Sequence, residues 1–325
     1  AGGNREENLP KDQKKLRVVT TIFPQYDFVR QIAGDNVSLT MLLKPGEETH
    51  SYEPTPQDII AIQNADLFIY VGGENDEWVE DILESPEMED VKRLRLVDCV
   101  GNILAEEHVE GMKEERGHSH EDEEEESHDE EEHFLHSAEE TEEEHNEHVH
   151  TMDEHVWTSP GNAIDIVEHI TEELCSLDSE HGQTYKDNAE AYETQLKELD
   201  TAFRDVVENA KNHTLLFGDR FPFRYFAAEY GLDYYAAFSG CASDTEPSAA
   251  TMAFLINKVK EEHIPVVLKM ELSNDNIANA IAEACDVPVK VFYSSHNISA
   301  KQFEAGVTYL DLMKENVETL KEALR

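Results

Sequence analysis

Four short apolar runs set the architecture of the first part of this chain: LRVVTTIF (16–23), VSLTMLL (37–43), LFIYVG (67–72) and RLRLVDCV (93–100). Each run is rich in β-branched residues and has the length of a buried strand. A second series follows further along: TLLFG (214–218), LDYYAAF (232–238), PVVLKM (265–270) and VKVFYS (289–294). The runs therefore predict two sets of strands, one in each part of the chain.

Helical patterns separate these strands. Thr55-Pro56 followed by Asp58 supplies an N-cap, a proline at the first helical position and an acid at the third, which predicts a helix over 56–64. Ser159-Pro160 predicts a helix over 161–176 in the same way. Strands that alternate with helices are typical of parallel sheets covered on both faces. For 325 residues, two α/β domains are expected.

A long helical pattern lies between the two series. Its apolar residues recur at spacings of four and three: Tyr185, Ala189, Tyr192, Leu196, Leu199, Phe203, Val206 and Ala210. At 1.5 Å per residue, this stripe spans about 39 Å, the length of a small domain. We therefore predict two α/β lobes, each a mainly parallel sheet flanked by helices, joined by a long rigid connecting helix. The predicted boundaries are a polar tether at 1–14, a first lobe at 15–181, the connecting helix at 182–211 and a second lobe at 212–325.

The charge is strongly negative. The chain has 72 acidic residues against 26 basic ones, formally −46, and 16 histidines. A nucleic-acid partner is excluded because phosphate binding needs a basic surface. Between Ala105 and His155 there are 23 acids and 10 histidines with almost no apolar residues. We predict a disordered His/acid-rich loop over about 105–152, inserted in the first lobe, since such a segment cannot bury enough surface to fold. Acids together with histidines suggest a cation as the ligand.

Four possible metal ligands follow predicted strands or precede a helix. His50 lies after 37–43, His155 before the helix at 161–176, Asp219 directly after 214–218 and His296 after 289–294. The carboxyl ends of parallel strands form the ligand crevice, so two groups from each lobe converge on one cleft. Three imidazoles and a carboxylate suit four-coordinate Zn²⁺. Each residue taken alone also fits an ordinary solvated side chain, and Asp219 could instead pair with Arg220 or Arg224.

Two motifs around these residues resemble a known family. GEETHSYEPTPQD (46–58) and EHVWTSP (154–160) are similar to segments in the solute-binding subunits of zinc and manganese ABC importers. The similarity continues through RYFAAEYGL (224–232) and TYLDLMKEN (308–316) and covers about 16–325. The resemblance implies a receptor that binds one metal between two lobes and passes it to a membrane permease. It also implies an extracytoplasmic location, with residues 1–14 as the tether of a lipoprotein or periplasmic protein, and a monomer.

The chain departs from the family at two ligand positions. The third family ligand falls on Arg220, which has no lone pair to offer, while Asp219 stands one residue earlier. The fourth, usually Asp, is His296. The expected ligands are thus His50, His155 and His296 with Asp219 or water. This set favours zinc over manganese, which prefers more oxygen ligands.

Two other functions remain open from the sequence. A zinc hydrolase would need an open metal position and a base, for which Glu47, Glu48 or Glu154 is available, but the HExxH motif is absent. A metal buffer would act through the His-rich loop alone. We expect a receptor without catalytic activity.

The four cysteines form no CxxC motif. If the chain is extracytoplasmic, as the resemblance implies, Cys241 and Cys285 could form a disulfide in the second lobe. Two buried thiols fit the sequence equally well.

Overall fold

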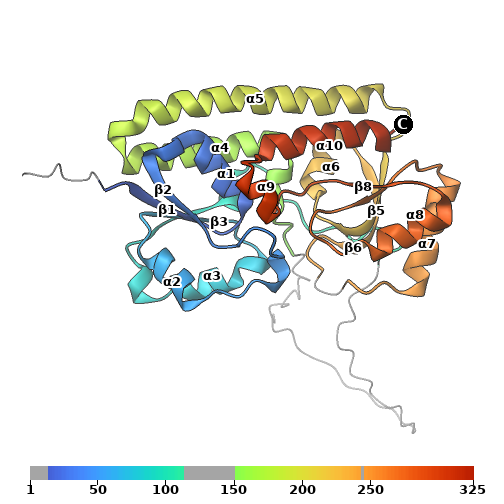
Figure 1. Ribbon diagram of the computed structural model, residues 1–325, viewed down its shortest axis with the longest axis horizontal. Coiled ribbons are helices and arrows are strands. Elements are labelled where there is room, and N and C mark those ends of the chain that lie inside the picture. Colours follow the sequence, from blue (N-terminus) through green and yellow to red (C-terminus); the bar gives the residue numbers. More distant parts are fainter. Residues whose placement is uncertain (1–13, 113–150, 243–244) are drawn as a thin grey trace, which may run out of the picture.

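The computed structural model describes residues 14–112, 151–242 and 245–325. It contains two four-stranded parallel sheets side by side (Figure 1). The first has the order β2-β1-β3-β4 and the second the order β6-β5-β7-β8. The strands are β1 (Leu16–Thr20), β2 (Val37–Met41), β3 (Leu67–Tyr70), β4 (Lys92–Arg95), β5 (Thr214–Phe221), β6 (Asp233–Ser239), β7 (Val267–Lys269) and β8 (Val289–Val291). The predicted fold class is confirmed.

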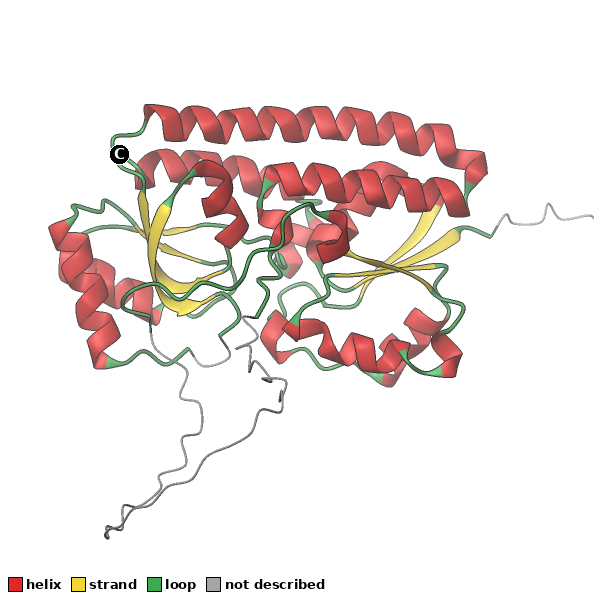
Figure 2. Ribbon diagram, turned by 180° about the vertical axis from the view of Figure 1, so that it is seen from behind, coloured by secondary structure: helices red, strands yellow, loops and turns green. Residues whose placement is uncertain are grey.

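Helices cover both faces of each sheet (Figure 2). Leu67 and Ile69 of β3 belong to the large core shared with α1 and α4, while Phe68 and Tyr70 pack in a smaller core with α2 and α3. Because successive strand residues face opposite sides, burial on both faces produces the continuous apolar runs seen in the sequence. The helices are α1 (Phe23–Ala33), α2 (Pro56–Gln63), α3 (Glu77–Leu83), α4 (Pro160–Leu177), α5 (Gly182–Asn209), α6 (Arg224–Tyr230), α7 (Ala249–Glu261), α8 (Asn276–Cys285), α9 (Ala300–Glu304) and α10 (Tyr309–Ala323).

The predicted helix starts are correct. Thr55 caps α2 with its hydroxyl on the backbone N–H of Asp58, and the Asp58 carboxylate accepts from the N–H of Thr55 in return. Ser159 caps α4 through the N–H of Asn162. The reciprocal pair at α2 and the single bond at α4 satisfy backbone donors that a helix start leaves free.

Several strand ends differ from the prediction. The run 93–100 stops being a strand at Arg95, and Leu96–Cys99 form a 3₁₀ turn. In the second lobe, β5 continues to Phe221 with a register irregularity between Phe217 and Arg220. Asp219 therefore lies inside a strand and not directly after one. Apolar content could not reveal this, because the extension begins with two charged residues, Asp219 and Arg220.

Helix α5 runs along one side of the molecule over both lobes, and α10 starts near the boundary and lies beside it over the second lobe (Figure 1). The 28 residues of α5 bury the predicted stripe from Tyr185 to Phe203, whereas Val206 and Ala210 are only half-buried. The second helix, α10, was not expected to join the lobes. Its first N–H, on Tyr309, donates to Asp27 of α1 at 2.7 Å, and farther along Asn316 exchanges hydrogen bonds with the backbone of Tyr293.

The large core is continuous between the lobes. One cluster of buried side chains includes Val18 and Trp157 from the first lobe, Leu196 from α5, and Phe217 and Phe226 from the second lobe. The lobes are thus joined by apolar packing as well as by two helices. None of the helices in the described ranges has the length and apolar character needed to cross a bilayer.

The predicted tether and most of the His/acid-rich loop lie outside the described residues. The ends of the loop are more ordered than we predicted. Ala105 and Met152 form an antiparallel bridge, and the N–H of Glu106 donates to Thr151 at 2.8 Å. The loop therefore leaves the first lobe through a paired stem.

Candidate metal centre

His155 is fully buried in the segment that leads into α4. Its Nδ1 and its backbone N each lie 2.9 Å from Oδ1 of Asp153. Since Nδ1–H donates to the carboxylate, the lone pair of the neutral ring is on Nε2, which is buried and has no hydrogen-bond partner. Burial lowers the pKa of His155, but the carboxylates of Asp153, Glu154 and Glu106 together outweigh burial and the net pKa is raised. An oriented imidazole with a free Nε2 is typical of a metal ligand.

His296 is held in the same way from the second lobe. Its Nδ1 lies 2.6 Å from Oγ of Ser294, and that hydroxyl donates to Oε1 of Glu271 at 2.5 Å. The hydroxyl therefore accepts from Nδ1–H, and the lone pair is again on a buried Nε2 without a partner. Burial lowers the pKa of His296 well below its usual range, and the nearby charges of His155, His50 and Arg220 lower it further. The ring is thus neutral at pH 7.

The two imidazoles meet at the boundary between the lobes. Their centroids are 4.8 Å apart, and the ring of Trp157 stands edge-on to both, at 5.5 Å from His155 and 4.9 Å from His296. Nε1 of Trp157 donates to the carbonyl of Ser294 at 2.7 Å. This indole bond joins the two segments that carry the rings, so the imidazole pair is fixed by contacts across the boundary.

His50 completes the group from a 3₁₀ turn, Thr49–Ser51. It is half-buried and lines a cavity of about 30 Å³ together with His296, Glu271 and Arg220. Burial, followed by the charges of Arg220 and His155, lowers the pKa of His50 to about 4. The amide of Asn297 donates to the carbonyls of Lys44 and Glu47 at 2.8 Å each, which attaches the His50 loop to the second lobe. The structure therefore brings the three predicted histidines together.

Both carboxylate oxygens of Asp219 are engaged by hydrogen-bond donors of the protein. Its Oδ1 accepts from the N–H of Arg220 at 2.8 Å, and its Oδ2 accepts from the N–H of Met270 at 2.9 Å and from the hydroxyl of Ser273. Its carboxylate serves to tie β5 to the end of β7.

Arg220 occupies the cavity wall. Its guanidinium contacts Oε1 of Glu48 at 2.9 Å and the carbonyl of Ala242 at 2.5 Å, and the residue is 5% exposed. A fixed cation beside three imidazoles would oppose a metal ion, but the Glu48 carboxylate offsets that charge. This side chain stands where the family resemblance predicted a ligand.

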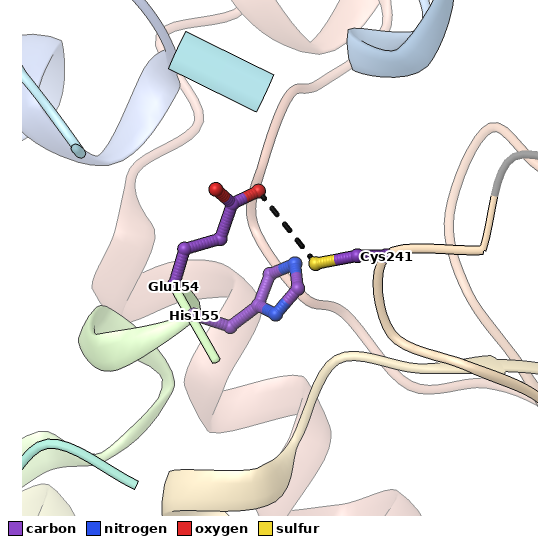
Figure 3. A group of neighbouring side chains, drawn as sticks. All are labelled: Glu154, His155 and Cys241. Carbon is purple, nitrogen blue, oxygen red and sulfur yellow. Dashed lines mark hydrogen bonds between the residues drawn. The ribbon is translucent and has the colours of Figure 1, made fainter. Parts of the chain in front are cut away.

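His155 also belongs to a second group of side chains that could hold a metal ion, which the sequence did not suggest (Figure 3). Ligand atoms of Glu154, His155 and Cys241 lie within 4.8 Å of one another. Burial raises the pKa of Glu154 to about 7 and the pKa of the Cys241 thiol above its usual range. Cys241 follows β6 as His296 follows β8, which is the one signal in the sequence that could have drawn attention to it.

Of the two alternatives that the sequence left open for Cys241 and Cys285, the structure has the free thiols and not the disulfide. All four cysteines are free thiols. Cys241 contacts Glu154 of the first lobe, whereas Cys285 ends α8 and its Sγ lies near the carbonyl of Ile256. The two sulfurs belong to different surroundings, and their spacing in the sequence contained no information on this.

The family model for the periplasmic zinc-uptake complex component A matches residues 18–323. The chain belongs to this family. It is 32% identical over 316 residues to the zinc-binding lipoprotein AdcA of Streptococcus pneumoniae, covering 97% of this chain and 57% of the relative. It is 31% identical over 333 residues to the high-affinity zinc uptake system protein ZnuA of Bacillus subtilis, covering all of this chain and 93% of the relative. The chain thus spans a little over half the length of the AdcA relatives.

Solved structures of this family have the same fold. The Zn(II)-bound ZnuA-like domain of S. pneumoniae AdcA aligns with a TM-score of 0.71 at 28% identity, covering 95% of this chain and 99% of that one. The metal-dependent lipoprotein YcdH of B. subtilis aligns with a TM-score of 0.73 at 27% identity, covering 95% and 99%.

Proposed function

We propose that this chain is an extracytoplasmic zinc-binding receptor that delivers Zn²⁺ to the permease of an ABC importer. Its ligands are His50, His155 and His296. The names of the relatives support the metal and its uptake, since AdcA is a zinc-binding lipoprotein and ZnuA belongs to a zinc uptake system. The family is described as a periplasmic component of a zinc-uptake complex, which supports the location and the partner.

One observation carries the proposal. Two fully or nearly buried imidazoles, His155 and His296, each have Nδ1 bonded to an acceptor and Nε2 buried without a partner. Leaving a buried acceptor without a hydrogen bond costs about 1–3 kcal/mol. His155 is 0% and His296 7% exposed, so the presence of two such nitrogens at one boundary needs a physical reason. A metal ion that accepts both lone pairs is that reason.

The donor set favours zinc. Three neutral imidazoles are borderline ligands that suit Zn²⁺, whereas Mn²⁺ prefers oxygen. Because Asp219 is engaged by three donors, we assign the fourth position to a water molecule and not to its carboxylate. Glu48, held by Arg220 at the cavity wall, is placed to accept a hydrogen bond from that water.

The size of the cavity argues for transport and against hydrolysis. A volume of about 30 Å³ admits an ion and its water, whereas pockets for organic ligands measure about 300–1,000 Å³. Trp157 also holds the two imidazoles together across the boundary. We therefore infer a receptor and not an enzyme.

The test is a competition titration of the full chain with zinc and a high-affinity chelator. His50→Ala and His296→Ala should each weaken the tightest equivalent by orders of magnitude, because each removes a bond to the metal. His213→Ala is the matched control and should leave this affinity unchanged. His213 is exposed and directly precedes β5, at the amino end of the strand, whereas the candidate site lies toward the carboxyl ends of the strands. Trp157 emission, measured in a Trp78→Phe background, gives a second readout because its ring contacts both imidazoles.

The proposal fails if His50→Ala and His296→Ala both keep the affinity of the unmodified chain. It also fails if manganese binds the unmodified chain more tightly than zinc does.

A further inference from the structure

The group formed by Glu154, His155 and Cys241 is the strongest feature that the proposed function leaves unused. Oε2 of Glu154 and Nε2 of His155 are both buried without a hydrogen-bond partner, and the two residues are 3% and 0% exposed. The third member, Cys241, presents its sulfur to them, with Sγ 3.9 Å from the other Glu154 oxygen, Oε1 (Figure 3). The unpaired Nε2 of His155, a carboxylate oxygen of Glu154 and the thiol of Cys241 thus converge on one point (Figure 3).

We propose that Glu154, His155 and Cys241 form a second position for a zinc-like cation. It is distinct from the position between His50, His155 and His296, called the imidazole cavity below. The two positions have His155 in common. The proposal rests on the proposed function in so far as His155 belongs to both groups. The expected ligands are borderline and soft divalent ions, namely Zn²⁺, Co²⁺ and Cd²⁺, because a thiolate favours these over Mn²⁺ or Mg²⁺.

The geometry is close to that of a bound ion. Zinc bonds of about 2.0 Å to nitrogen and oxygen and 2.3 Å to sulfur place tetrahedral ligands about 3.3–3.5 Å apart. The three ligand atoms lie within 4.8 Å of one another, so inward movements of about 1 Å or less complete the site. When the ion binds, the thiol releases its proton to solvent and bonds through the thiolate, and water fills the remaining position.

Neighbouring residues hold the trio in place. The side chain of Asn75 donates to Oε1 of Glu154, which holds the carboxylate with this oxygen toward the thiol. The backbone N–H of Cys241 donates to Oε1 of Glu106 at 3.2 Å, which anchors the loop after β6 to the stem of the acidic loop. The position therefore lies where the His/acid-rich segment enters the first lobe.

The two positions exclude each other. Nε2 of His155 has one lone pair and binds one ion at a time. The folded part of the chain therefore holds a single ion, in either the thiolate position or the imidazole cavity. The thiolate position lies beside the acidic stem. An ion that binds there can keep His155 as a ligand and exchange only Glu154 and Cys241 for His50 and His296.

The experiment is cobalt binding to the full chain, measured by absorption in the presence of a phosphine reductant. Thiolate-bound Co²⁺ gives a charge-transfer band in the near ultraviolet that imidazole and carboxylate ligands do not give. The His/acid-rich loop contains no cysteine, so it cannot produce this band. His50→Ala, which disables the imidazole cavity, should show the band, and Cys241→Ser in the same background should lose it.

Cys285→Ser is the matched control, since its thiol lies on α8 and should leave the band intact. His296→Ala provides a second variant in which the band is expected. The proposal is overturned if neither histidine variant shows the band, or if the band survives Cys241→Ser. These outcomes leave the proposed function standing, because that is tested by the zinc affinity of His50→Ala and His296→Ala and not by a sulfur signal.

Discussion

Replacing Asp153 by Asn should weaken zinc binding without touching a ligand atom. Oδ1 of Asp153 accepts from both the backbone N and Nδ1 of His155 at 2.9 Å, and the residue is 1% exposed. Asparagine keeps an acceptor oxygen there but removes the charge. Loss of such a partner behind a metal-bound imidazole costs about 10–100-fold in affinity, or about 1.4–2.7 kcal/mol.

The effect should depend on pH with a definite sign. The Asp153 carboxylate raises the pKa of His155, so in the unmodified chain a proton competes with zinc for this ring as the pH falls through that pKa. Each unit below it costs about tenfold in apparent affinity. In Asp153→Asn, burial lowers the pKa of His155 and only the charges of Glu154 and Glu106 still raise it, so the competition begins at lower pH. The variant should therefore be weakest relative to the unmodified chain near pH 8, and the gap should narrow toward about pH 5.5.

The assay is the same chelator competition, repeated across this pH range. Asp178→Asn is the matched control, because Asp178 contacts Nδ1 of His181 at 2.8 Å in a comparable pair outside the candidate site. Equal zinc affinities of Asp153→Asn and the unmodified chain near pH 8, or a gap that does not change with pH, would refute the reasoning.

Three further predictions test the surroundings of the site. Gly240→Ala should weaken zinc binding by about tenfold in the chelator assay, since its Cβ would lie 2.8 Å from the backbone oxygen of Phe221 and 3.2 Å from Cε1 of His155 and force this segment and the ring apart, whereas Gly101→Ala, with open space around it, should not. Deletion of residues 113–150 should remove weaker metal equivalents in equilibrium dialysis and keep the tight one, because this segment contributes many additional histidines and carboxylates as metal ligands; a single equivalent before and after deletion would contradict this. Asp27→Ala should lower the free energy of unfolding in urea by about 3 kcal/mol, because it strands the buried donors that hold α10, and a loss below about 1 kcal/mol would count against that assignment.

The fold was predictable because both sheets are buried on both faces. Runs such as LFIY at β3 and the capping residues Thr55 and Ser159 are local signals that the structure follows within a few residues. The exception is informative: β5 extends over Asp219 and Arg220, whose side chains find buried partners that no local pattern reveals. Tertiary hydrogen bonds, not propensity, set that strand end.

The site was predictable only in part. The three histidines could be found because strand ends converge in parallel sheets. The groups that orient them could not, since Ser294 and Glu271 come from different strand ends and form a chain to His296 only in space. Cys241 was missed for the same reason, because its neighbours Glu154 and His155 are about ninety residues away in the sequence.

The apolar core that passes from one lobe through α5 into the other has a consequence for how the molecule melts. Since neither lobe has a large core that ends at its own boundary, the two should lose structure together, in one calorimetric transition whose van't Hoff and calorimetric enthalpies agree. An ion bound at the boundary then stabilises every element at once, and its binding free energy appears as a shift of the single midpoint. For such a chain, a melting curve recorded with and without zinc is also a measurement of zinc affinity.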